Sequence, residues 1–168
     1  MIVDEHNKTN FKFQNLNMIL RSIFLNGEEI PKTYTCLGPN VSPPLFFDEI
    51  PEEAKSLVLI FEDVDAIPKW THWMLFNIPP ATTEIKEGTI PEGAVEGLAN
   101  NHSFGYEGPC PKYFEGIHHY WYRIFALDIV LDLPAATERE VVEEKMREHV
   151  IAKAYLLGLC NSHSEIVK

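Results

Sequence analysis

Short apolar runs separated by turn-forming residues dominate the pattern of this chain. The runs SLVLIFED (56–63) and HWMLFNIP (72–79) are continuously apolar, as in strands buried on both faces, and YWYRIFALD (120–128) is interpreted as an alternating strand. Most of the twelve prolines lie between such runs, where a missing N–H group interrupts no strand pairing. The pattern therefore predicts a mainly β protein with long, stiff loops.

One long helix is predicted near the C-terminus. Thr137 and Glu140 have the spacing of a capping box at its start, and Gly158 is suited to end it. An apolar stripe at helical spacing would run along one face, formed by Val142, Met146, Val150, Ala154 and Leu157. The stripe predicts a helix that packs on the outside of the β structure.

The first part of the chain differs from the rest. Residues 1–17 are mostly polar, and the first apolar segment, MILRSIFL, begins at Met18. We expect residues 1–17 to form a flexible tail. Residues 18–168 contain no repeat and no low-complexity segment, and their length suits one hydrophobic core. They are interpreted as a single domain.

Charge and composition exclude several classes of partner. A net charge of −11 opposes broad contact with nucleic acid or with anionic lipid surfaces. No apolar run is long enough to span a bilayer, and the N-terminus lacks the features of a signal peptide, so no stable membrane insertion is expected. Three widely spaced cysteines favour a reducing compartment over a disulfide framework. These features predict a cytoplasmic protein.

Two loops with polar residues precede predicted strands. TCLGPNVSPPL (35–45) has, by itself, the composition of a rigid turn. Asp63 and Asp65 follow an apolar run, so both carboxylates would point the same way in an extended chain, and His72 begins the next strand. A carboxylate here would accept an N–H of His72 and raise its pKa. Alternatively, the acids cap a turn and His72 is a core residue.

A third loop precedes the alternating strand, in GYEGPCPKYFEGIHHYWYRIFALD (105–128). Its glycines allow close approach of a ligand to the backbone, and its prolines stiffen it. His118 and Tyr120 would share one face of the strand, with His119 on the other. We expect that face to form the floor of a small-ligand pocket. The alternative is that Tyr120 and Tyr122 are ordinary sheet aromatics.

Three blocks of the sequence, at 27–45, 62–79 and 105–128, resemble in order the signature blocks of the phosphatidylethanolamine-binding protein family, in particular its prokaryotic Raf-kinase-inhibitor-like branch. The resemblance implies an antiparallel β-sandwich with peripheral helices and a pocket for phosphate and phosphorylated head groups. By motif position, the ligand-binding residues would be Asp63, His72, Gly108, Pro109, His118 and Tyr120, supported by Asp65 and Pro111.

The chain departs from the family pattern at the rim of this implied pocket. The family has D-P-D-A-P, whereas here Val64 replaces the first proline and Ile67 is inserted before Pro68. The cis Ala–Pro bond that the family pattern implies cannot form at this position, and whether Ile67–Pro68 takes its place as a cis bond stays open. His119 replaces an arginine, and residues 112–116, KYFEG, lengthen the third loop. The family's ligand preference cannot be transferred directly to a rim that differs in this way.

The sequence therefore predicts a non-enzymatic binding protein for a small phosphorylated or other anionic ligand, without cofactor, metal or catalytic residues. It would be a monomer or homodimer and a modulator of a kinase or other partner protein, or, as an alternative, a protease inhibitor that uses the same pocket. One alternative is a hydrolase with Cys110 as nucleophile, His118 or His72 as base and Asp63 as orienting acid. The prolines on both sides of Cys110 disfavour it, because a proline offers no N–H to an oxyanion. Another alternative is a zinc site formed by Asp63, His72 and His118, although their spacing matches no metal motif.

Overall fold

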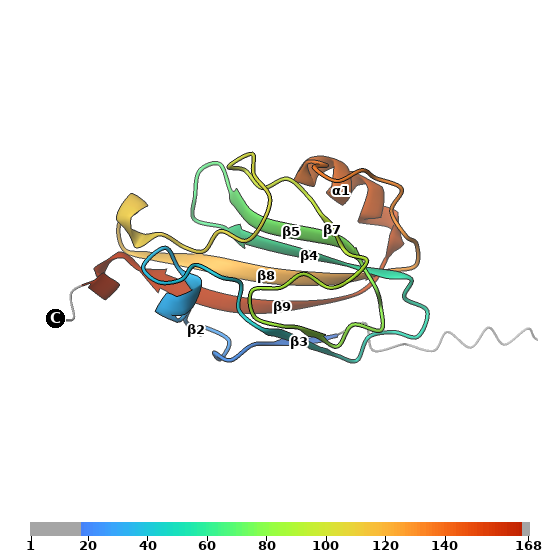
Figure 1. The fold of residues 1–168 in the computed structure, drawn as a ribbon, viewed down its shortest axis with the longest axis horizontal. Coiled ribbons are helices and arrows are strands. Elements are labelled where there is room, and N and C mark those ends of the chain that lie inside the picture. The colour runs from blue at the N-terminus through green and yellow to red at the C-terminus, as the bar shows by residue number, and fades with distance from the viewer. Residues whose placement is uncertain (1–17, 166–168) are drawn as a thin grey trace, which may run out of the picture.

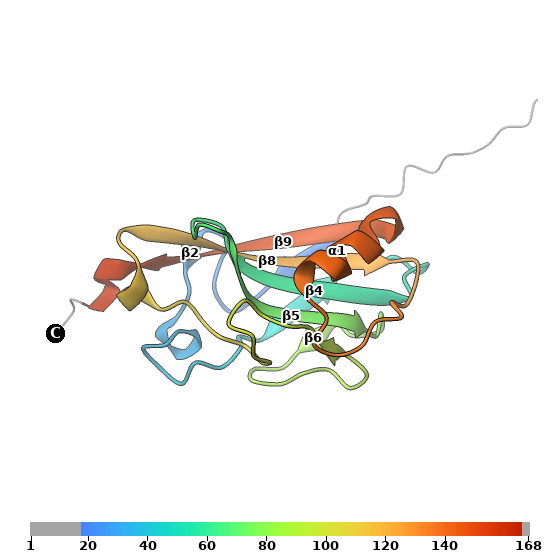
Figure 2. The ribbon, with the colours of Figure 1, turned by 90° about the horizontal axis from the view of Figure 1, so that it is seen from above.

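The computed structural model describes residues 18–165 and confirms a mainly β fold built from two sheets (Figures 1 and 2). The large sheet has the strand order β2 (Glu28–Glu29), β9 (Val150–Asn161), β8 (Ile117–Leu127), β4 (Ser56–Asp63), β5 (Trp70–Ile78) and β7 (Val95–Glu96). The small sheet has the order β1 (Ile19–Arg21), β3 (Leu45–Asp48) and β6 (Glu84–Ile85). All neighbouring strands are antiparallel except β2 and β9.

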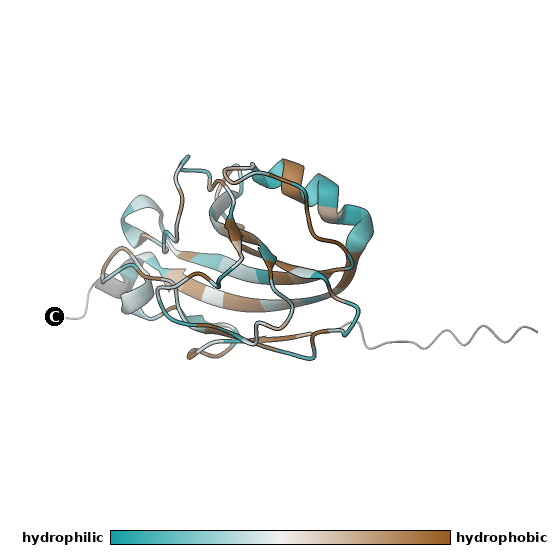
Figure 3. Ribbon diagram, turned by 45° about the vertical axis from the view of Figure 1, so that its right-hand side comes forward, coloured by the Kyte–Doolittle hydropathy of each residue, from teal (hydrophilic) through white to brown (hydrophobic). Residues whose placement is uncertain are grey.

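The continuous apolar run of β4 is explained by burial on both faces of the large sheet. Leu57, Leu59 and Phe61 pack in the core shared with the small sheet. Val58 and Ile60 pack in a second core, which includes Val142 and Met146 of α1 (Arg139–Met146). Figure 2 shows α1 lying across the large sheet, and Figure 3 shows that the helix is mostly hydrophilic. Each face of β4 is therefore covered by a different element.

The predicted long C-terminal helix is wrong, because α1 ends at Met146 and residues 150–161 form β9. The stripe from Val142 to Leu157 fits a helix, but residues 152–160 also alternate between buried and more exposed positions, as in a strand. β9 provides the backbone partners of β8 from Ile117 to Leu127. A helix would leave the backbone groups of this β8 edge unpaired.

The two signals that were expected to delimit the long helix have other roles. The hydroxyl of Thr137 donates to the carbonyl of Pro134 at 2.6 Å, and α1 has no side-chain cap. Gly158 lies inside β9, where a Cβ atom would come within 2.4 Å of a side-chain carbon of Ile30. Glycine is required there because β2 and the chain that follows it approach β9 closely.

The prediction of reduced cysteines is also wrong, because Cys36 and Cys110 form a disulfide across 74 positions of sequence. Cys160 is free and buried. Spacing alone did not reveal the pair, since its two halves lie on separate loops that only the fold brings together. The cysteines therefore no longer support a cytoplasmic location, which stays a prediction.

Two further predictions concern the limits of the domain. The expected tail, residues 1–17, lies outside the described residues, and the assignment of 18–168 to one domain stays a prediction. None of the helices within residues 18–165 combines the length and the apolar character needed to cross a membrane.

Candidate functional site

A pocket of about 530 Å³ opens at the edge of the large sheet where β4 ends and β5 and β8 begin. The strand register brings these ends together, because Asp63 is paired with Trp70 on one side and with Tyr120 on the other. The lining comprises Asp63, Asp65, Ala66, Ile67, Trp70, His72, Glu107, Gly108, Cys110, Tyr113, Phe114, His118 and Tyr120. Pairing in the sheet thus unites side chains from two distant segments of sequence.

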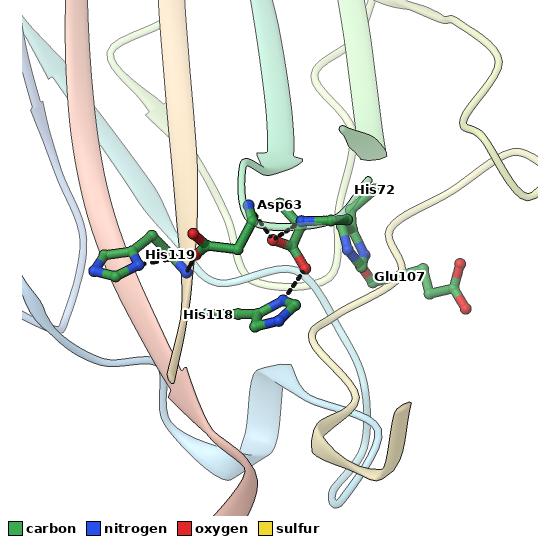
Figure 4. A network of polar contacts seen from close by, with 7 residues as sticks. Asp63, His72, Glu107, His118 and His119 are labelled. Carbon is green, nitrogen blue, oxygen red and sulfur yellow. Dashed lines mark hydrogen bonds and ion pairs between the residues drawn. The ribbon is translucent and has the colours of Figure 1, made fainter. Parts of the chain in front are cut away.

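Asp63 and His118 form the central polar pair of the pocket (Figure 4). The Nδ1 atom of His118 lies 2.7 Å from Oδ2 of Asp63, which is buried. The other carboxylate oxygen of Asp63 accepts the backbone N–H groups of Asp65 and Ala66, at 2.9 and 3.2 Å. The carboxylate is therefore fixed from both sides, and it orients the His118 ring with Nε2 left for a ligand.

His72 has a different environment from the one predicted. Its Nδ1 atom lies 2.8 Å from the backbone carbonyl of Glu107, and Asp63 hydrogen-bonds His118 instead. Burial lowers the pKa of His72, and this effect outweighs the opposite influences of Glu107 and Asp63. The expected rise in its pKa is therefore wrong. A neutral His72 donates from Nδ1 to the carbonyl and offers Nε2 as an acceptor.

Asp65 does not share the orientation of Asp63. Its Oδ2 atom accepts the backbone N–H of His119 at 2.6 Å and lies 2.8 Å from Nδ1 of the same histidine. Burial acts to raise the pKa of Asp65, but the hydrogen bonds from His119 lower it overall. Figure 4 shows His118 and His119 on opposite sides of β8, as the alternation of the strand predicts. The two carboxylates diverge because β4 ends at Asp63 and the chain then bends.

Tyr120 is buried behind the two pocket histidines and keeps its proton. Burial, reinforced by the negative charge of Asp63, raises the pKa of Tyr120 far above its ordinary value. Its ring meets that of His72 edge-on, with centroids 5.4 Å apart. Tyr120 thus contributes an aromatic wall to the pocket, and its hydroxyl is a hydrogen-bond donor to Asp63.

The wall opposite the strands is a loop held tightly against residues 34–40. The N–H of Gly108 donates to Oδ1 of Asn40 at 2.8 Å, and a Cβ atom at Gly108 would lie 2.0 Å from the carbonyl oxygen of Tyr34. The Cys36–Cys110 disulfide joins the same two loops, and the Cys36 N–H donates to the carbonyl of Pro109 at 3.0 Å. Only glycine allows this contact between the loops.

Pro109 and Pro111 are not part of the lining. Both are buried, and Pro111 begins the 3-10 helix Pro111–Tyr113. They border the loop that carries Gly108 and Cys110, so their place in the structure is to shape the wall.

Comparison with known proteins identifies the family and the fold. The sequence profile of the family described as "Phosphatidylethanolamine-binding protein" matches residues 21–161. The chain belongs to the phosphatidylethanolamine-binding protein family. Membership of this family suggests that the chain binds a ligand.

Several members of the phosphatidylethanolamine-binding protein family are similar over most of their length. A UPF0098 protein of Methanothermobacter thermautotrophicus is 49% identical over 136 residues, which cover 77% of this chain and 89% of the relative. The crystal structure of a homologue of the family from Chlamydia trachomatis has a TM-score of 0.81 at 40% identity, covering 87% of this chain and 98% of its own. Escherichia coli YbcL, described as a member of the mammalian family, has a TM-score of 0.79 at 25% identity, covering 86% and 98%.

The pocket also contains residues that sequence reasoning missed. Ile67, Trp70, Tyr113 and Phe114 line it, and the Phe114 ring stacks on His118 with centroids 3.8 Å apart. Three of the four lie in the segments where the chain departs from the family pattern, which were noted as altered but not as ligand contacts. The Ile67–Pro68 bond, which the sequence left undecided, is cis.

The two chemical alternatives are not supported by this geometry. A cysteine nucleophile needs a free thiolate, and Cys110 is disulfide-bonded to Cys36. Within residues 18–165, no group of three or more histidine, cysteine, aspartate or glutamate side chains is arranged to hold a metal ion. In the pocket, Asp63 hydrogen-bonds His118, and Nδ1 of His72 is occupied by the carbonyl of Glu107.

Proposed function

We propose that this protein binds phosphate or a small phosphorylated ligand, without turnover, in the pocket between His72 and His118. The observation that carries the proposal is the Asp63–His118 pair, whose geometry fixes Nε2 of His118 as a donor to an anion when the ring is protonated. The Tyr120 hydroxyl stays protonated at neutral pH and lies against Asp63, so it helps to hold that carboxylate in place. A neutral His72 adds an acceptor, which suits the protonated oxygen of a phosphate monoanion.

An acidic protein can bind an anion in this way because the hydrogen-bonding groups of the pocket would contact the anion directly. Physiological salt screens exposed charges over roughly 8 Å, so acids remote from the pocket add little to the repulsion of an anion despite the net charge of −11. Within the pocket, Asp63 carries a negative charge, but both of its oxygens already accept hydrogen bonds.

Calorimetric titration with sulfate tests the proposal. Sulfate keeps a constant charge between about pH 5.5 and 8, whereas a histidine loses its proton over this range. We expect the affinity of the wild-type protein to fall several-fold as the pH rises. His118→Gln should bind weakly with a nearly flat profile, and the matched control His149→Gln should behave as wild type, because His149 pairs with Asp128 and neither residue lines the pocket.

Two results would contradict this assignment. Undetectable binding of both sulfate and inorganic phosphate at low pH would refute the proposed function itself. A flat wild-type profile with intact binding would show that backbone N–H groups hold the anion, and the role given to His118 would then be wrong.

A further inference from the structure

The mouth of the pocket is apolar although its floor is polar. Ile67 is 98% exposed and Tyr113 is 86% exposed, and both line the pocket. Trp70 and Phe114 are half-buried beside them in the same lining. We call these four side chains the apolar collar. Exposed apolar groups gathered around a concave site are characteristic of a binding surface, whereas isolated ones need no explanation.

The pocket is larger than an inorganic anion would fill. Its volume of about 530 Å³ falls within the range of about 300 to 1,000 Å³ typical of sites for organic ligands. A phosphate ion, a single phosphorus atom with its oxygens, would occupy only the part next to Asp63, His72 and His118. The remaining volume lies against the collar.

The collar is directly continuous with the polar floor. The Phe114 ring stacks on the His118 ring at 3.8 Å between centroids, with 19° between the planes. An anion held by Nε2 of His118 would therefore have its substituent beside an aromatic edge. Ile67 belongs to the bend after β4, and Tyr113 and Phe114 belong to the lengthened loop before β8. The collar thus spans two segments in which this chain departs from its family.

The charges at the mouth favour the same kind of ligand. No lysine or arginine is among the lining residues, and the carboxylates of Asp65 and Glu107 accept hydrogen bonds from His119 and Asn101. A second anionic group at the mouth would therefore find no cationic side chain in the lining, whereas an apolar substituent needs none. A highly charged ligand such as a nucleoside triphosphate is therefore disfavoured.

We propose that the ligand is a small organic phosphate with an apolar or aromatic substituent, whose phosphoryl group binds the floor and whose substituent binds the collar. This inference rests on the proposed function and names the class of ligand for the same pocket. Burial of a phenyl group against such a surface is worth on the order of tenfold in affinity. The relevant comparison is between two monoesters with the same phosphoryl charge.

Calorimetry with inorganic phosphate, methyl phosphate, n-butyl phosphate and phenyl phosphate at one pH tests this inference. We expect n-butyl or phenyl phosphate to bind about tenfold more tightly than methyl phosphate. Ile67→Ser and Tyr113→Ser should each remove several-fold of that gain and leave the affinity for methyl phosphate unchanged. Val130→Ser, which removes a 60% exposed side chain that is not part of the lining, is the matched control and should change neither affinity.

The possible failures are distinguishable. Equal affinities for all four phosphates would refute the role of the collar in binding the substituent, but they would not contradict the proposed function. An equal loss for methyl and phenyl phosphate in the collar variants would show that Ile67 and Tyr113 only support the loops, which also refutes the inference. Absence of binding by every phosphate would refute the proposed function itself.

Discussion

Reduction of the Cys36–Cys110 disulfide is expected to destabilise the protein strongly without abolishing its fold. The bond links the loop at 34–40 to the loop that forms one wall of the pocket. When it is reduced, hydrogen bonds from Cys36 to Pro109 and from Gly108 to Asn40 still join the two loops. The main loss is therefore the restriction that the bond places on the unfolded chain.

The size of this loss follows from the separation of the two cysteines. Closing a loop across 74 positions corresponds to about 4.5 kcal/mol of unfolded-state entropy at 25 °C. Because the reduced native state also gains some freedom, we expect the free energy of unfolding to fall by about 2 to 4.5 kcal/mol. Domains of this size lose about 2 to 4 °C in Tm per kcal/mol, so the Tm should fall by roughly 10 °C.

Urea unfolding with and without a phosphine reductant measures this difference. The double variant Cys36→Ser/Cys110→Ser is the control, because its stability should match that of the reduced wild type and should not respond to reductant. Thiol titration of unfolded protein purified without reductant should detect only Cys160. Detection of all three cysteines would refute the bond. Equal stability of verified oxidised and reduced protein would refute the entropic argument.

Three further predictions concern other parts of the chain. A chain that begins at Met18 should keep its Tm within a few degrees, as measured by calorimetry, because the family match begins only at residue 21. Loss of the folded state in this shortened chain would show that residues 1–17 are needed for folding. In unfolding measured between about pH 7.5 and 5, the free energy of unfolding should fall as the pH drops below about 6.5, because burial lowers the pKa of His72 in the native state and the unfolded state then binds the extra proton. The fall should level off below the native pKa. An unchanged pH dependence in His72→Gln would show that it has another origin. In urea unfolding, Arg139→Ala should cost about 2 kcal/mol, because Glu62, 0% exposed, loses one of two ion-pair partners and keeps Arg123. The exposed control Arg147→Ala should change stability by less than about 0.5 kcal/mol, and equal effects would refute the role of burial.

The sequence by itself determined the central strands and the outline of the site. The runs at 56–63 and 72–79 have the length and apolar character of strands buried on both faces, and their turn-forming flanks limit them. The motif blocks also indicated that Asp63, His72, His118 and Tyr120 belong together, and all four line one pocket. The local sequence pattern predicted the secondary structure correctly where the residues fitted either a strand or a helix clearly better than the other.

Tertiary structure alone decided which partner each polar group has. Asp63 and His72 are close in sequence, yet the carboxylate hydrogen-bonds His118 because β8 is the neighbour of β4 on that side. The Cys36–Cys110 bond and the collar likewise depend on loops that meet only in the folded chain. Such pairings depend on distances between segments that are remote in sequence, and no local period encodes those distances.

The C-terminal segment shows most clearly where prediction from the local sequence pattern fails. Residues 142–157 carry a helical stripe, while residues 152–160 also alternate with the period of a strand, so the local pattern fitted two structures. β8 decided between them, because its backbone N–H and C=O groups from Ile117 to Leu127 need partners along the edge that faces away from β4. A strand satisfies those groups and buries Ala152, Ala154 and Leu156 in the core, whereas a helix could do only the second.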